Sequence, residues 1–262
     1  MRKILKWTFL VLFLIILAGA AFCVWVYWGG RTSNPHGYAK VGDIPTPRGY
    51  SRIAGVDAGQ AKYLRNLPLK KSGAKVELYK GGEARLQSLC YAVVNVPIIS
   101  NAEQCADVCM RLRAEYLFAT RQYDRISFND VNGNRLAYYG GDSRKALEKY
   151  LKKLYGVAST YSLSRDMKTR PLKDIQPGDV FVYPKGRYNQ KMGHAIMVAD
   201  VAVNKKGKKA FLLIEGNTPA RSMHVMRNLL NPFSSPWFLL DDDAEHILID
   251  GFPFRATDLK RF

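Results

Sequence analysis

The feature that most limits what this chain can fold into is an uncharged apolar run near its N-terminus. Residues 7–28 read WTFLVLFLIILAGAAFCVWVYW and follow the basic residues Arg2, Lys3 and Lys6. At about 1.5 Å per helical residue the run spans roughly 33 Å, close to the roughly 30 Å hydrocarbon core of a bilayer. The run therefore predicts one N-terminal transmembrane helix, and a folded domain has to come from the remaining residues.

A secretory signal peptide is the alternative interpretation of the same run. The small residues AGA at 18–20 resemble a cleavage site, but the apolar run continues beyond them to residue 28. That continuation favours an uncleaved anchor. The basic residues before the run favour a cytoplasmic N-terminus, so we expect the rest of the chain to lie outside the cytoplasm.

The charge balance narrows the class of partner. The chain has 40 lysine and arginine residues against 22 aspartate and glutamate residues, a net charge of +18. Such a surface attracts polyanions. Because the domain is expected outside the cytoplasm, we predict anionic envelope polymers or lipid headgroups as partners and no nucleic acid. With 47% hydrophobic residues, the composition is that of a globular protein.

The order of predicted elements indicates an α+β fold. Residues 29–49 are rich in glycine, proline and polar residues and are predicted to be a linker, followed by a single domain over 50–262. Helices are predicted within 58–70, where Pro68 stops the helix, and at 100–122 and 143–159. Strand patterns with turns between them are predicted at 75–86, 89–99, 126–139, 179–183, 194–203, 210–215 and 223–228. Late strands joined by short turns form an antiparallel sheet, not an alternating parallel one.

The helix predicted from residue 100 has the clearest sequence signals. Ser100 with Glu103, or Asn101 with Gln104, forms a capping box at its start. With either cap, Cys105 falls in the second turn, where the helix dipole contributes little. The apolar face is spaced as in a helix and consists of Cys105, Val108, Cys109, Leu112 and Tyr116.

Candidate catalytic residues follow from the order of this helix and the later strands. Thiol hydrolysis needs a thiolate, an imidazole to generate it and a third group to orient the ring. Cys105 lies on the helix, His194 opens one strand, and Glu215 or Asn217 ends the hairpin partner. Because the two strands are joined by the turn at 204–209, their ends meet at one sheet edge. Gln104 is the candidate donor for an oxyanion.

Simpler interpretations exist for each of these residues. Cys105 and Cys109 can both be core residues, and His194 can cap carbonyls at a strand end. Cys105 and Cys109 at i, i+4, with His194, would also suit a metal, but no motif supports a metal or a cofactor. We expect none. The other histidines, His36, His224 and His246, have no evident partners in the sequence.

Sequence motifs around these residues resemble two groups of known families. GDVFV, then GHAIMVADV, then a hairpin to IEGN resembles the NlpC and CHAP families of peptidoglycan-cutting enzymes. This likeness implies a papain-like core with a helix packed on an antiparallel sheet. QCADVCMRLRAEYL, IQPGDVFV, GHAIMVADVAVNKKGKKAFLL and DLKRF, within about 45–262, resemble an uncharacterised bacterial domain family of unknown function.

The sequence therefore predicts a single-pass protein of the bacterial inner (cytoplasmic) membrane with its C-terminal domain outside the cytoplasm. The first functional hypothesis is a thiol hydrolase acting on envelope peptide or amide bonds. The alternative is a non-catalytic module that binds anionic envelope material through its basic surface.

Overall fold

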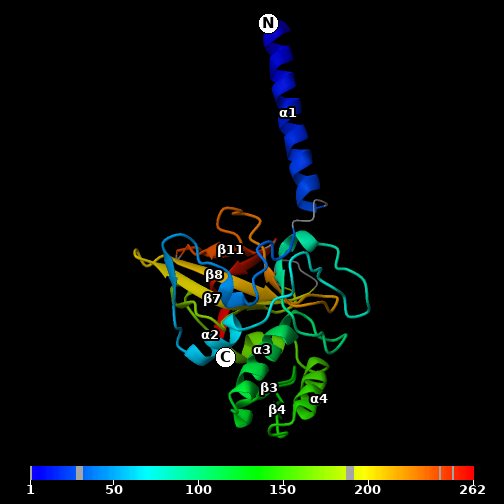
Figure 1. The fold of residues 1–262 in the computed structure, drawn as a ribbon, viewed down its shortest axis with the longest axis vertical. Coiled ribbons are helices and arrows are strands. Elements are labelled where there is room, and N and C mark those ends of the chain that lie inside the picture. The colour runs from blue at the N-terminus through cyan, green and yellow to red at the C-terminus, as the bar shows by residue number, and fades with distance from the viewer. Residues whose placement is uncertain (1, 28–31, 187–191, 242, 250) are drawn as a thin grey trace.

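The computed structural model describes residues 2–27, 32–186, 192–241, 243–249 and 251–262. Helix α1 (Arg2–Tyr27) stands away from the rest of the molecule (Figure 1). The side chains of Lys6–Cys23 within it are unburied, and this segment is long and apolar enough to cross a membrane. The predicted N-terminal apolar helix is confirmed, and either an anchor or a signal sequence would have these properties.

A nine-stranded antiparallel sheet forms the centre of the domain, with the path β2-β9-β8-β7-β6-β13-β5. Strand β1 pairs with β7 and β10 pairs with β8 at the margins. The strands are β1 (Tyr50–Arg52), β2 (Cys90–Val93), β5 (Lys168–Thr169), β6 (Val180–Tyr183), β7 (His194–Asn204), β8 (Lys209–Glu215), β9 (His224–Met226), β10 (Phe238–Leu239) and β13 (Leu259–Arg261). The two remaining pairs are β3 (Ser127–Asn129) with β4 (Arg135–Ala137), and β11 (His246–Ile249) with β12 (Phe252–Arg255).

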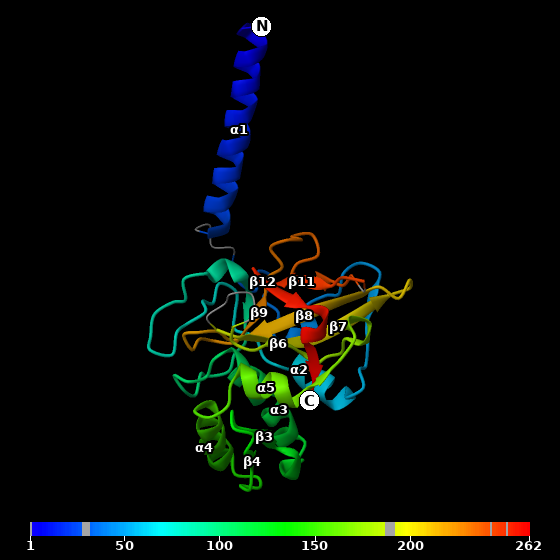
Figure 2. The same cartoon turned by 180° about the vertical axis from the view of Figure 1, so that it is seen from behind.

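Helices cover one face of this sheet and the β11–β12 hairpin covers the other (Figure 2). The helices are α2 (Ala58–Arg65), α3 (Cys105–Ala119), α4 (Arg144–Tyr155) and α5 (Thr160–Asp166). The predicted α+β class is confirmed. Helix α2 ends at Arg65, shortly before Pro68, which was predicted to stop it. The segment predicted as one helix at 143–159 is followed by a further short helix, α5.

Alternation along β7 produces two separate cores. Ala195 and Met197 pack in the cluster that contains α3, whereas Ile196 and Val198 pack in the cluster that contains Phe254 of β12. Because successive side chains of a strand point to opposite faces, a strand buried on both sides has to be apolar throughout. This explains why the run after His194 is almost continuously apolar.

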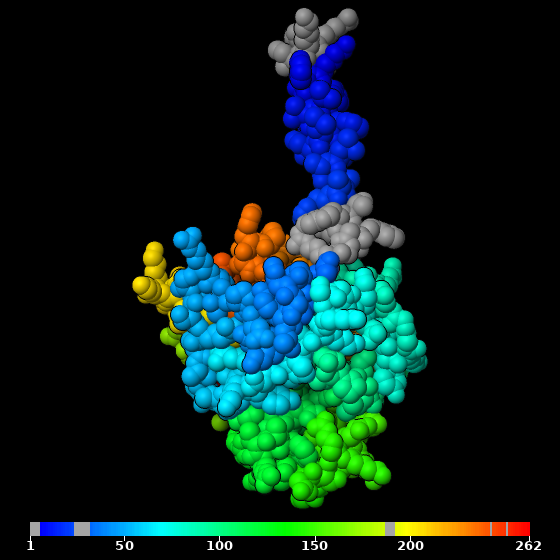
Figure 3. Space-filling view, viewed as in Figure 1, coloured from blue at the N-terminus to red at the C-terminus, as the bar shows by residue number. Residues whose placement is uncertain are grey.

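The segment predicted as a linker is part of the folded domain where it is described. Val41 and Ile44 are fully buried in the core. The side chain of Asn34 donates to the carbonyls of Tyr38 and Lys70 at 2.9 and 2.8 Å. In Figure 3 this segment lies against the body of the domain. Turn-forming residues predict irregular backbone correctly, but they do not predict whether that backbone packs against a core.

Candidate active site

Helix α3 begins at Cys105, which is its first helical residue, with Gln104 as the N-cap. The Asp107 carboxylate accepts the backbone N–H of Gln104 at 2.9 Å. The prediction that Cys105 lies in the second turn is therefore wrong. Ser100 instead closes a turn before the helix by accepting the N–H of Ala102. In the first turn, Cys105 receives the full effect of the helix dipole, which favours a negative group there.

A buried ion pair holds the loop before Cys105 onto the helix. Glu103 accepts a hydrogen bond from Arg111 at 2.6 Å, and the two residues are 1% and 3% exposed. Arg111 also donates to the carbonyl of Pro97 at 2.8 Å. The Glu103 carboxylate accepts the N–H of Ile99 as well. The capping pair predicted for Glu103 with Ser100 is replaced by this set of contacts.

His194 and Glu215 meet at one end of the sheet, as the hairpin geometry predicts. His194 opens β7 opposite Tyr183 of β6, and Glu215 ends β8. The distance from His194 Nε2 to Glu215 Oε2 is 3.3 Å, and both side chains are buried. Neither atom has a well-aligned hydrogen-bond partner among the described residues, so this contact is an ion pair rather than a directed hydrogen bond. The His194 ring stacks on Phe252 at 4.1 Å between ring centroids.

A second histidine, His224 of β9, contacts the other oxygen of the same carboxylate. Its Nε2 lies 3.2 Å from Glu215 Oε1, and its Nδ1 lies 3.1 Å from the carbonyl oxygen of Ser222. The sequence analysis found no partner for His224. The register of β8 and β9 would have identified this contact, because Glu215 and His224 are direct partners across the two strands.

The electrostatics of this cluster favour a charged imidazole and a charged carboxylate. Burial, the largest effect on Glu215, raises its pKa, but His194 and His224 outweigh it and bring the pKa to about 2. Burial likewise lowers the pKa of His194, but interactions with Cys105 and Glu215 raise it to about 9. The thiol and the carboxylate thus both favour the protonated imidazole.

The thiol also borders an open cleft of about 490 Å³. Cys105 is 7% exposed and lines this cleft together with Gln104 and Gly193, whereas His194 and Glu215 do not line it. A Cβ on Gly193 would come within 2.6 Å of the Tyr183 carbonyl oxygen, so glycine is needed at this close approach. A small group entering the cleft would reach the sulfur.

The other predicted residues have different positions. The Gln104 side-chain Oε1 accepts the hydroxyl of Thr218 at 2.8 Å, which leaves its Nε2–H groups as donors beside the cleft. Asn217 caps its own loop by accepting the N–H of Thr218, and no contact with His194 is seen among the described residues. Glu215, not Asn217, is therefore the group beside the imidazole. Cys109 is fully buried, and burial raises its pKa well above that of a free thiol.

No group of three or more histidine, cysteine, aspartate or glutamate residues is arranged to hold a metal in the described part of the chain. Cys90, Cys105 and Cys109 are free thiols.

A stability measurement tests the unusual burial of Asp107. Burial, against the opposing hydrogen bond from Gln104, raises its pKa to about 7 from 3.8. The unfolded chain therefore loses this proton at a lower pH than the folded chain does, and stability falls as the pH rises from about 4 to 7. We expect Asp107→Asn to increase the free energy of unfolding, and we expect this increase to be about 2 kcal/mol larger at pH 8 than at pH 5. Urea unfolding of both proteins at the two pH values checks this, and an equal change at both would contradict it.

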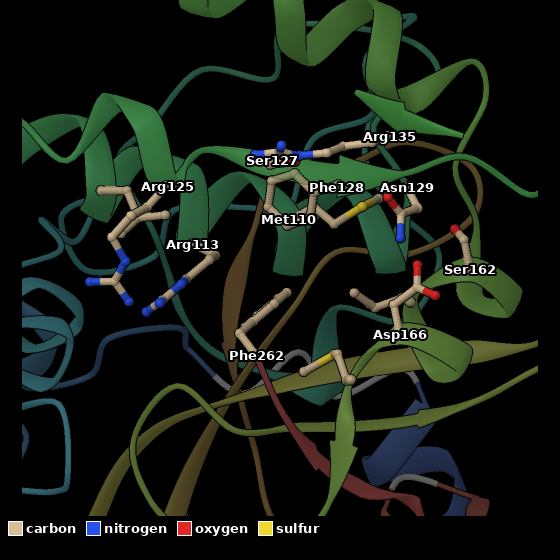
Figure 4. Close-up of a pocket in the computed structure, with 13 residues that line it drawn as sticks. Met110, Arg113, Arg125, Ser127, Phe128, Asn129, Arg135, Ser162, Asp166 and Phe262 are labelled. Atoms are coloured by element: carbon tan, nitrogen blue, oxygen red, sulfur yellow. Dashed lines mark hydrogen bonds between the residues drawn. The ribbon is translucent and has the colours of Figure 1, made fainter. Parts of the chain in front are cut away.

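A second pocket, of about 440 Å³, is lined by residues of α3, β3, β4 and α5 (Figure 4). Its walls combine the apolar side chains of Phe128 and Phe262 with Arg113 and Arg125. Arg113 is engaged with Asp57 at 3.3 Å. The lining contains no cysteine and no histidine, so it cannot form a cysteine–histidine pair. The cleft at Cys105 is the better candidate for chemistry.

Comparison with known proteins agrees with the second of the two resemblances. A family model described as "Domain of unknown function (4846)" matches residues 42–140 and 139–261. No curated protein and no solved structure matches the chain significantly. The matches together cover most of the chain and include Cys105, His194 and Glu215. The chain therefore belongs to this family of domains of unknown function.

Proposed function

We propose that this protein is a thiol hydrolase that cleaves amide or peptide bonds, with Cys105 as nucleophile, His194 as general base and acid, and Glu215 as the group that orients the imidazole. One observation carries the proposal: the first residue of α3 is a cysteine that interacts with a buried imidazole, which is itself paired with a carboxylate. A buried core cysteine would need neither partner. Cys109, one turn later, is such a core residue.

The proposed reaction uses these groups in two steps. The Cys105 thiolate adds to the carbonyl carbon of the substrate, and the charge that develops on its oxygen is stabilised by the Gln104 side-chain N–H and the helix terminus. His194 then protonates the departing amine, the C–N bond breaks, and a thioester remains. In the second step His194 takes a proton from water, hydroxide attacks the thioester and the C–S bond breaks. The carboxylic acid is released, and the Cys105 thiolate and the protonated His194 are regenerated.

The same constellation supports a papain-like core as the finer description of the fold. In the NlpC and CHAP families, as the sequence resemblance implies, cysteine on a helix precedes histidine on a strand and an acid or amide on the next strand. Helix α3 packs on β7 and β8 here, and Gly216 lies so close to the helix that a Cβ there would approach Val108 Cγ2 to 2.5 Å. Glu215 occupies the third position of that order.

The proposed substrate is cell-envelope material. The apolar helix α1 and the net charge of +18 both suit a domain tethered near an anionic surface. Lipid headgroups or an anionic wall polymer would then be the partners held by the basic surface. The uncleaved anchor belongs to the same proposal.

Release of new amino groups tests the hydrolase directly. Wild-type protein is expected to generate them from isolated bacterial cell-wall sacculi and from cross-linked wall peptides, whereas Cys105→Ala is expected to generate none above background. Amino groups are quantified by derivatisation and chromatography. Binding of sacculi by both proteins, without release by either, would instead support the non-catalytic binding module.

Membrane attachment is tested by fractionation. We expect the full chain to remain in the membrane pellet after carbonate extraction, because an 18-residue apolar window of α1 is enough to hold it in a bilayer. Intact-mass measurement then distinguishes the two interpretations of α1. Loss of the segment up to about residue 20 would identify a cleaved signal and contradict the anchor.

A further inference from the structure

Two residues that line the cleft beside Cys105 each carry a buried polar atom without a hydrogen-bond partner. These atoms are Asp107 Oδ1 and the Tyr155 hydroxyl, and neither has a partner among the described residues. Both residues are 6% exposed, and both line the cleft of about 490 Å³. Unpaired buried polar atoms cost free energy, so a site that retains two of them in one cleft suggests a ligand that completes them.

The chemistry of the two atoms indicates what that ligand is. Asp107 Oδ2 is occupied by the N–H of Gln104, which leaves Oδ1 as an acceptor. Burial raises the pKa of this carboxyl, and the negative charge of Glu103 raises it further. No ion pair to Asp107 is seen among the described residues, and the neighbouring Arg111 is bonded to Glu103. A carboxylate and a phenol oxygen together accept hydrogen bonds from a group that carries several N–H donors and a positive charge.

We propose that Asp107 and Tyr155 form a binding subsite for a primary ammonium group beside the Cys105 thiol. This inference rests on the proposed function in one respect, which is that the ammonium group belongs to the substrate of the hydrolase. It adds a substrate class, namely peptides or amides that carry a free amine near the bond that is cleaved. A quaternary ammonium group has the same charge but no N–H donor, so this subsite discriminates against it.

Labelling Cys105 with methanethiosulfonates tests the subsite without any knowledge of the substrate. In each reaction the thiolate attacks the sulfenyl sulfur, a disulfide forms, the bond to the sulfonyl sulfur breaks and methanesulfinate departs. The reagents are 2-aminoethyl methanethiosulfonate, its trimethylammonium analogue and the neutral methyl compound. The full chain in detergent micelles is used, and labelling at Cys105 is followed by peptide mass spectrometry.

The informative quantity is the rate with the aminoethyl reagent divided by the rate with the trimethylammonium reagent. We expect this ratio to be about tenfold higher in the wild-type protein than in Asp107→Asn, and also higher than in Tyr155→Phe. Because both reagents attack the same thiolate, the ratio of the two rates does not depend on how far the thiol is ionised in each protein. Because the same two reagents are used on the wild type and on Asp107→Asn, the difference in reagent size affects both ratios equally. The side-chain amide introduced by Asp107→Asn keeps an oxygen for the Gln104 N–H, so the cap of α3 is preserved. Asp166→Asn, in the pocket of Figure 4, is the matched control and should leave the ratio unchanged.

Three outcomes are distinguishable. Equal ratios in the wild type and both variants would overturn the subsite, and so would a complete lack of labelling at Cys105, because no ligand could then enter. A failure of the hydrolase has a different signature: the neutral methyl reagent would label the wild type and His194→Ala at the same rate. The ammonium preference can survive that result, since it requires only Asp107, Tyr155 and an accessible sulfur.

Discussion

In the His194→Ala variant, iodoacetamide is expected to alkylate Cys105 at pH 6 about tenfold more slowly than in the wild-type protein. At that pH an ordinary cysteine thiol is only about 0.3% ionised, and an imidazolium partner can increase the thiolate fraction by about two orders of magnitude. A stabilised thiolate is also a weaker nucleophile, and this lowers the alkylation rate by about one order of magnitude. The net effect of removing the imidazole is therefore about tenfold.

The charge state of His194 explains why this residue should dominate the activation. The contact with Cys105 is among the interactions that raise the pKa of His194 to about 9, so the imidazole carries a proton at pH 6. The matched control is His246→Ala, which removes an exposed histidine of β11 and should not alter the rate. Rates are measured by mass spectrometry of the peptide that contains Cys105. Indistinguishable rates in the wild type and His194→Ala would remove the basis for a hydrolase.

Replacement of Arg111 by methionine is expected to lower the free energy of unfolding by about 3–5 kcal/mol. The variant leaves the Glu103 carboxylate buried without its partner at 2.6 Å. Burial already raises the pKa of Glu103, while Arg111 opposes that shift, so removal of Arg111 leaves either a protonated acid or an isolated buried charge. The carbonyl of Pro97 also loses its donor.

Urea unfolding of the full chain in micelles, followed by near-ultraviolet circular dichroism, measures this loss. Lys152→Met is the matched control, because Lys152 pairs with Glu148 at the surface of α4 and exposed ion pairs contribute little. A double variant, Glu103→Gln with Arg111→Met, should recover part of the loss by removing the stranded charge. If Arg111→Met lowers the free energy of unfolding no more than Lys152→Met does, the buried pair does not hold the loop that precedes Cys105.

The local patterns of apolar and turn-forming residues predicted the helix and the strands that contain the candidate site. The helical spacing after residue 104 predicted the body of α3, and the turn at 204–209 predicted the β7–β8 hairpin that brings Glu215 back to His194. The first residue of α3 was predicted less well. Ser100 and Asn101 are the favourable caps in isolation, but the observed cap is Gln104. The contact of Glu103 with Arg111 is formed only when the loop folds back onto the helix.

The role of His224 could not be predicted from local pattern. It depends on which strand lies beside β8, and strand order is a property of the whole sheet. The same is true of Asp107 and Tyr155, which lie on α3 and α4 and share a cleft only because the two helices pack together. Periodicity reports which face of a helix is buried, but it does not report which buried polar atoms remain without a partner.

The sequence by itself determined the apolar N-terminal helix, the α+β class and the pairing of β7 with β8, because hydrophobic periodicity and turn residues act over short stretches of chain. Only the tertiary structure decided that Cys105 starts its helix, that one carboxylate lies between two imidazoles, and that residues 32–49 belong to the domain. These features depend on the burial of charge and on contacts between distant segments, whose free energies exist only once the chain has folded.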